Sequence, residues 1–177
     1  MLARDGGQVW ALRLEGKTDQ EKFKELGWGL RTWDQWNFNE CDERFGDDWP
    51  GRIPAQLVAH ALFYFTKPGD LVLDPMAGGG VVPDVCLLFE RKCQSFDIAT
   101  RDNRADIHYH HWDPQNWKWP ITRKPDLIFF DPPASPERER WRAGQSAFKK
   151  AILVVPFEFC WESRKKPPRN FSYSSFL

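Results

Sequence analysis

The sequence lacks three features that would assign it to a specialised class of protein. Its four cysteines, Cys41, Cys86, Cys93 and Cys160, form no CxxC pair and are too few for a disulfide scaffold, so we expect reduced thiols. Its 25 basic and 25 acidic residues cancel, which argues against a polybasic nucleic-acid tail or an acidic solvating domain. No apolar run approaches the roughly 18 residues of a membrane span, and the N-terminus lacks the apolar stretch of a signal peptide. We therefore expect a cytoplasmic protein with no membrane partner.

Residues that could bind a metal ion are also scarce. The cysteine spacing does not fit a zinc site. His108, His110 and His111 lie close together in a polar segment, where a solvated cluster is a better interpretation than a set of ligands. We therefore expect no metal.

The chain is long enough for one globular domain, and its charge distribution divides it. The last 44 residues carry nine basic and four acidic side chains, whereas the rest has a net negative charge. The sequence favours three segments: an N-terminal aromatic-rich extension over residues 1–48, a core over residues 49–133, and a basic, partly disordered tail over residues 134–177.

Short apolar runs that end at or beside an acidic residue recur along the core. They lie at residues 71–74, 93–98 and 126–131, and each predicts a strand. Apolar residues at helical spacing predict a helix over residues 54–65, and a second helix is expected over residues 81–91. Apolar strands separated by helices indicate a parallel sheet covered on both faces. The predicted fold class is α/β with a doubly wound, mostly parallel sheet.

A glycine-rich turn connects the first predicted strand to the next helix. Its sequence, DPMAGGG, runs from Asp74 to Gly80. Glycines at this place let the backbone turn sharply and approach a ligand with no Cβ in the way. Nicotinamide-dependent oxidoreductases also have such a turn, but their G-x-G-x-x-G fingerprint has no Asp-Pro before the glycines. The turn therefore predicts a ligand site and argues against a nicotinamide cofactor.

Two acidic residues follow at the ends of later predicted strands. Asp97 is placed either to accept hydrogen bonds from the hydroxyls of a ribose or to cap a helix. Asp131 precedes Pro132 and Pro133, which fix the backbone and have no N–H group. The Asp131 carboxylate and the Pro132 carbonyl are then two acceptors held near one point. Such a pair suits an exocyclic amino group.

These motifs together resemble a known family. The segments GRIPAQLV, YFTKPGDLVLDPMAGGG, SFDI and DLIFFDPP are similar to those of the S-adenosylmethionine-dependent amino-methyltransferases of DNA, which methylate exocyclic amino groups of adenine or cytosine. The resemblance covers roughly residues 49–133. It implies a Rossmann-like methyltransferase fold, S-adenosyl-L-methionine as the cofactor and DNA as the substrate.

The resemblance also implies roles for particular residues. Asp97 would bind the ribose of the cofactor, and Asp113 in HHWDP would contact its adenine. Asp131, Pro132 and Pro133 would form the catalytic motif that holds the target amino group, with the target base flipped out of the duplex. The rest of the cofactor would be held by Asp74, Pro75, Ala77, Gly78, Gly80, Arg52 and Pro54.

The sequence departs from the family pattern after the Asp-Pro-Pro motif. Ala134 stands where the family has an aromatic residue that stacks on the flipped base, and the tail resembles none of the family's further strands. We therefore expect a sheet that is incomplete at its C-terminal end, with an unpaired edge, as a truncated or frameshifted reading frame would give. Two alternatives stay open: a non-catalytic remnant that retains cofactor binding, and an RNA amino-methyltransferase.

One further segment has two interpretations. The sequence DERFGDDWPGR, residues 42–52, is acidic and becomes basic at Arg52. It fits either the lip of a substrate site or a solvated loop, and the sequence does not separate the two.

Overall fold

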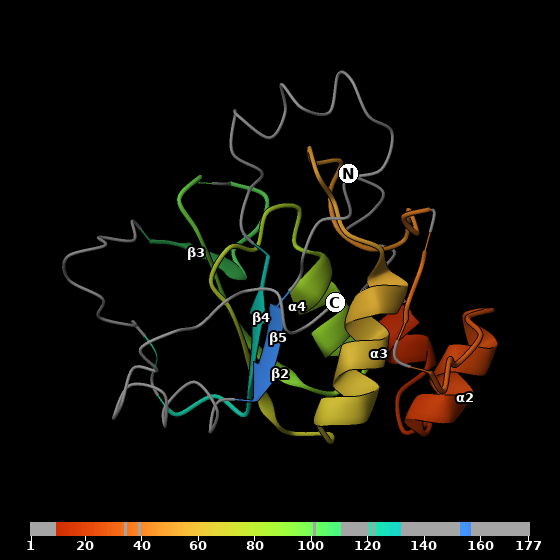
Figure 1. Ribbon diagram of the computed structural model, residues 1–177. Coiled ribbons are helices and arrows are strands. Elements are labelled where there is room, and N and C mark those ends of the chain that lie inside the picture. Colours follow the sequence, from red (N-terminus) through yellow and green to blue (C-terminus); the bar gives the residue numbers. More distant parts are fainter. Residues whose placement is uncertain are drawn as a thin grey trace, which may run out of the picture.

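A five-stranded sheet forms the centre of the chain (Figure 1). The computed structural model describes residues 10–33, 35–38, 40–100, 102–110, 121, 123–131 and 153–156. The strands are β1 (Leu71–Asp74), β2 (Lys92–Asp97), β3 (Ile107–Tyr109), β4 (Leu127–Phe130) and β5 (Leu153–Pro156). Their order in the sheet is β3-β2-β1-β4-β5. This order places β1 at the centre, where the chain reverses its direction of travel across the sheet.

Four strands of the sheet run parallel and one does not. β1 pairs in parallel with both β2 and β4, and β2 pairs in parallel with β3. β5 pairs antiparallel with β4, with Phe129 opposite Val154. The predicted strands and the α/β class with a mostly parallel sheet are confirmed. The predicted unpaired edge is wrong at β4, because the apolar run of the tail supplies β5 there.

The helices labelled in Figure 1 lie on one side of this sheet. They are α2 (Asp19–Glu25), α3 (Ala55–Phe65) and α4 (Val81–Leu88). α4 ends earlier than predicted, because Glu90 takes a left-handed conformation with φ of 61° and the chain turns into β2. Within the described part of the chain, no helix has the length and apolar character needed to span a membrane.

Alternating side chains of the strands enter two apolar clusters. On β1, Val72 belongs to the larger cluster, which contains residues of α2, α3 and α4, whereas Leu73 belongs to a smaller one. On β4, Phe129 belongs to the larger cluster and Ile128 to the smaller one. This period of two assigns successive residues to opposite faces of the sheet. The larger core fixes the position of α4 and therefore of the glycine turn that precedes it.

The predicted N-terminal extension shares the larger core. A capping box starts α2: Thr18 Oγ1 accepts a hydrogen bond from the Glu21 N–H, and the Glu21 carboxylate accepts one from the Thr18 N–H. Phe23 on α2 packs edge-on against Phe89, with ring centroids 5.5 Å apart. Asp19 accepts two hydrogen bonds of 2.8 Å from the buried Arg91. Residues of α2 are therefore part of the same packed unit as the sheet.

A buried histidine joins α3 to the segment that follows α2. The side chain of His60 is inaccessible to solvent; its Nδ1 lies 2.6 Å from the Gln56 carbonyl, and its Nε2 accepts a hydrogen bond from the Arg31 N–H. A carbonyl can only accept, so Nδ1 carries the proton and the ring is neutral. Burial lowers the pKa of His60, in agreement with this tautomer.

Candidate active site

A cavity of about 460 Å³ opens at the carboxyl ends of the parallel strands. It is lined by the segment 49–53, by the glycine turn after β1, and by residues at the ends of β2 and β4. This is the edge at which open α/β sheets bind their ligands. The volume lies in the range of about 300–1,000 Å³ that is typical of small-molecule sites.

Asp74 is the most deeply buried acidic group in this cavity. Its side chain is 1% exposed, Oδ1 accepts a hydrogen bond of 3.2 Å from the Met76 N–H, and Oδ2 has no hydrogen-bond partner. Burial, with a smaller effect of the carboxylates of Asp131 and Asp97, raises the pKa of Asp74 to about 8. An unpartnered carboxyl oxygen at this position favours a ligand that brings a positive charge or a hydrogen-bond donor.

Asp97 holds the glycine turn from the neighbouring strand. Its Oδ2 accepts a hydrogen bond of 2.8 Å from the Gly78 N–H, and its Oδ1 accepts one of 2.9 Å from the Ala99 N–H. The Ala77 N–H donates to the Phe96 carbonyl beside it. Each carboxylate oxygen has two lone pairs, so Asp97 keeps acceptor capacity for a ligand while it fixes the turn.

The structure brings together most of the residues predicted to bind the cofactor. Arg52, Asp74, Ala77, Gly78 and Asp97 all line the cavity, and so does Asp131 from the end of β4. β1 and β4 are adjacent and parallel, so the predicted catalytic acid lies beside the predicted cofactor residues. Of the two interpretations of residues 42–52, the structure favours a lip, because residues 49–52 form one wall of the cavity.

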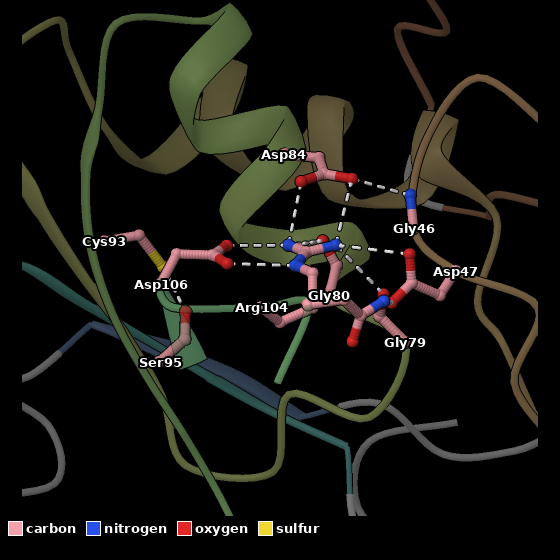
Figure 2. Close-up of polar contacts among 10 residues, drawn as sticks. Gly46, Asp47, Gly79, Gly80, Asp84, Cys93, Ser95, Arg104 and Asp106 are labelled. Carbon is pink, nitrogen blue, oxygen red and sulfur yellow. Dashed lines mark hydrogen bonds and ion pairs between the residues drawn. The ribbon is translucent and has the colours of Figure 1, made fainter. Parts of the chain in front are cut away.

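Some predicted residues lie elsewhere or outside the described part of the chain. Pro54 caps the start of α3 and does not line the cavity, and neither does Pro75. Gly80 has a positive φ of 81° and packs on the guanidinium of Arg104, where an added Cβ would lie 2.4 Å from the Arg104 Cζ (Figure 2). Asp113, Pro132, Pro133 and Ala134 lie outside the described residues.

Sequence reasoning did not identify Trp49 as a site residue. Its side chain is 37% exposed, lines the cavity and packs on the glycine turn. An added Cβ at Gly78, whose φ is 49°, would lie 3.2 Å from the Trp49 ring. The only signal in the sequence is the place of Trp49 in the loop before α3, since binding residues often lie on loops.

Within the described residues, no group of three or more His, Cys, Asp or Glu side chains is arranged to hold a metal ion. The carboxylates of Asp97 and Asp131 instead give this site a negative field, which is one cause of the raised pKa of Asp74. That field suits an organic cation.

Comparison with known proteins gives one finding for the chain. A family model for DNA methylases of the N6/N4 methyltransferase type matches residues 5–104. No curated protein and no solved structure matches the chain. The matched range includes the N-terminal segment, the glycine turn and Asp97, and it ends before Asp131. Because the match spans more than half of the sequence, the chain belongs to the DNA methylase family of N6/N4 methyltransferases.

Proposed function

We propose that the chain binds S-adenosyl-L-methionine in this cavity and transfers its methyl group to an exocyclic amino group of adenine or cytosine in DNA. The observation that carries the proposal is the buried Asp74 Oδ2, which has no hydrogen-bond partner and lies at a cavity that Asp97 and Asp131 also line. S-adenosylmethionine has two positive charges near its methionine part, an ammonium and a sulfonium. A cavity with three carboxyl groups attracts such a ligand.

The residues present fit this cofactor. Asp74 would accept a hydrogen bond from the ammonium group, and its buried Oδ2 would then have a partner. Asp97 would accept hydrogen bonds from the ribose hydroxyls with the lone pairs that Gly78 and Ala99 leave free. Asp113 would contact the adenine, as the family resemblance implies. When bound, the cofactor supplies an electrophilic methyl group.

Asp131 and Pro132 would hold the amino nitrogen of the target base. A conjugated amino nitrogen is a poor nucleophile, because its lone pair is delocalised into the ring. Two acceptors, the Asp131 carboxylate and the Pro132 carbonyl, would draw its hydrogens aside and turn its lone pair toward the methyl donor. When the nitrogen is methylated, it would release one of its two protons to the Asp131 carboxylate. Catalysis on this account consists of positioning and electrostatics. The target base would leave the stack to reach Asp131.

Two other functions have specific support. A remnant that binds the cofactor without catalysis is favoured by Ala134, because loss of the stacking aromatic weakens the flipped base by about 1–3 kcal/mol. An RNA amino group is the other candidate substrate, because an Asp-Pro-Pro motif would bind only the amino nitrogen and not the sugar. Transfer assays with DNA and RNA separate these three functions.

Two measurements test the proposal. Calorimetry should detect binding of S-adenosylmethionine and of its demethylated product and no binding of NAD; the opposite pattern would reject the cofactor assignment. Tritiated-methyl transfer to DNA should then be measured for the wild type and for Asp131→Ala. We expect the variant to bind the cofactor nearly as well as the wild type and to transfer no methyl groups. Transfer that persists in the variant would remove Asp131 from the mechanism.

A further inference from the structure

A buried arginine lies directly behind the glycine turn. Arg104 is 1% exposed and does not line the cavity. Its guanidinium donates to both carboxylate oxygens of Asp106, at 3.0 and 2.7 Å, and to Asp84 Oδ1 at 2.8 Å (Figure 2). It also donates to the carbonyls of Gly79 and Gly80, at 3.3 and 3.2 Å. One side chain thus joins the start of α4, the start of β3 and the glycine turn.

The same network holds the segment Gly46–Trp49 against the glycine turn. The Asp47 N–H donates to the Gly79 carbonyl at 2.7 Å, and the Gly46 N–H donates to Asp84 Oδ2 at 2.7 Å (Figure 2). The Asp47 carboxylate lies 4.0 Å from the Arg104 guanidinium. Trp49, at the end of this segment, then packs on Gly78. Arg104, which does not line the cavity, therefore contacts both parts of this wall: the glycine turn and the segment 46–49.

We propose that Arg104 is a positioning residue for the cofactor: it holds the glycine turn and the Gly46–Trp49 segment together as one wall of the cavity. This inference rests on the proposed cofactor site. The hydrogen bonds from Arg104 to the Gly79 and Gly80 carbonyls fix the course of the turn. They therefore also fix the position of the Gly78 N–H, which donates a hydrogen bond to Asp97. The carboxylates of Asp84 and Asp106 keep the buried guanidinium charged and in place.

The contact between residues 104 and 80 requires an arginine at the first position and a glycine at the second. A planar guanidinium has five donors in a fixed fork, whereas a lysine ammonium has three on a flexible stem and cannot reach two carboxylates and two carbonyls together. Gly80 allows the guanidinium to approach, because an added Cβ would lie within 2.5 Å of three of its atoms. Arg104→Lys should therefore keep the positive charge but lose part of these hydrogen bonds.

The chain offers a matched control in Arg91. This residue is 4% exposed and donates two hydrogen bonds to Asp19 and others to the carbonyls of Phe89 and Thr66. It lies at the opposite end of β2 from Asp97, away from the cavity. Arg104→Lys and Arg91→Lys should both lower the melting temperature, since each removes hydrogen bonds from a buried arginine. Only Arg104→Lys should change the cavity.

The experiment has a ligand-dependent and a ligand-free arm. In the first, calorimetry with S-adenosylhomocysteine well below both melting temperatures should show binding at least about tenfold weaker for Arg104→Lys and unchanged for Arg91→Lys. In the second, amide hydrogen exchange of the ligand-free protein should become faster over residues 46–49 and 76–80 in Arg104→Lys alone. A milder pair, Asp106→Asn and Asp19→Asn, provides the same comparison if a lysine variant does not fold.

The outcomes separate the inference from the proposed function. If the wild type binds S-adenosylhomocysteine and the Arg104 and Arg91 variants behave alike in both arms, the positioning role is wrong. If the wild type does not bind this ligand, the proposed function is wrong, and the exchange arm alone decides whether Arg104 holds the wall. Equal exchange over the two segments in the paired variants overturns the inference in either case.

Discussion

The ionisation of Asp74 should lower the stability of the ligand-free protein as the pH rises. Asp74 is 1% exposed, and its Oδ2 has no hydrogen-bond partner. Its pKa is raised from the ordinary value of 3.8 to about 8, mainly by burial. Asp74→Asn tests this effect, because the amide has nearly the same shape, keeps an acceptor for the Met76 N–H and cannot ionise.

The sign and size follow from proton linkage. Between pH 4 and pH 8 the folded protein holds a proton on Asp74 that the unfolded chain releases, so the free energy of unfolding falls as the pH rises. Above the folded pKa of about 8 both states are ionised and the effect is constant. The advantage of Asp74→Asn over the wild type should therefore grow by roughly 4 kcal/mol between pH 5 and pH 8.

Urea unfolding of the wild type and the variant at four values between pH 5 and pH 8 measures this difference directly. Taking the difference cancels the titration of groups that the two proteins share, and the amide's own unpaired N–H adds a constant at every pH. A difference that stays the same across the series would refute the reasoning, since Asp74 would then titrate at its ordinary pKa. With saturating S-adenosylhomocysteine at pH 8, the wild type should instead be more stable than Asp74→Asn, because the ammonium of the ligand pairs with the ionised Asp74 carboxylate.

Three further changes have defined outcomes. Asp97→Ala should weaken binding of S-adenosylhomocysteine by at least about tenfold in calorimetry, because it removes acceptors for the ribose and for the Gly78 N–H together. Ala134→Tyr should raise the rate of methyl transfer by a factor that corresponds to about 1–3 kcal/mol, because the family resemblance implies an aromatic residue at this position that stacks on the flipped base; an unchanged rate would reject this role for the position. Thermal melts should show that the stability of the wild type relative to His60→Gln decreases as the pH falls below about 6.5, because His60 is neutral when folded and protonates when unfolded; taking the difference cancels the opposite effect of Asp74.

The fold was predictable where local pattern and tertiary packing agree. β1 and β4 are short apolar runs buried in the sheet, and α3 has apolar residues at helical spacing, so each element could be located from the sequence. β3 has one buried residue, Ile107, and so gives no apolar run. α2 has a capping-box signal at Thr18 and Glu21, but it is short and polar, and its place in the core depends on Phe23 contacting distant rings.

The candidate site was predictable for the residues that lie at strand ends and not for those that support them. Asp74, Asp97 and Asp131 end or follow buried strands, and the parallel sheet brings these ends to one edge. Trp49 reaches the same cavity from a loop between two helices, so its position depends on contacts that no local pattern encodes.

Arg104 shows why the supporting residues escape sequence analysis. In the sequence RDNRAD it has the composition of a solvated turn. Its burial depends on the carboxylates of Asp84 and Asp47, 20 and 57 positions away, as well as on the nearby Asp106. The glycine turn carried a partial signal. The sequence predicts that glycines there make room for a ligand. In the structure the neighbour of Gly78 is Trp49 at the cavity wall, whereas the neighbour of Gly80 is the Arg104 guanidinium. A glycine-rich turn thus reports close approach of some group, and the structure is needed to decide whether that group is a ligand or a side chain of the protein itself.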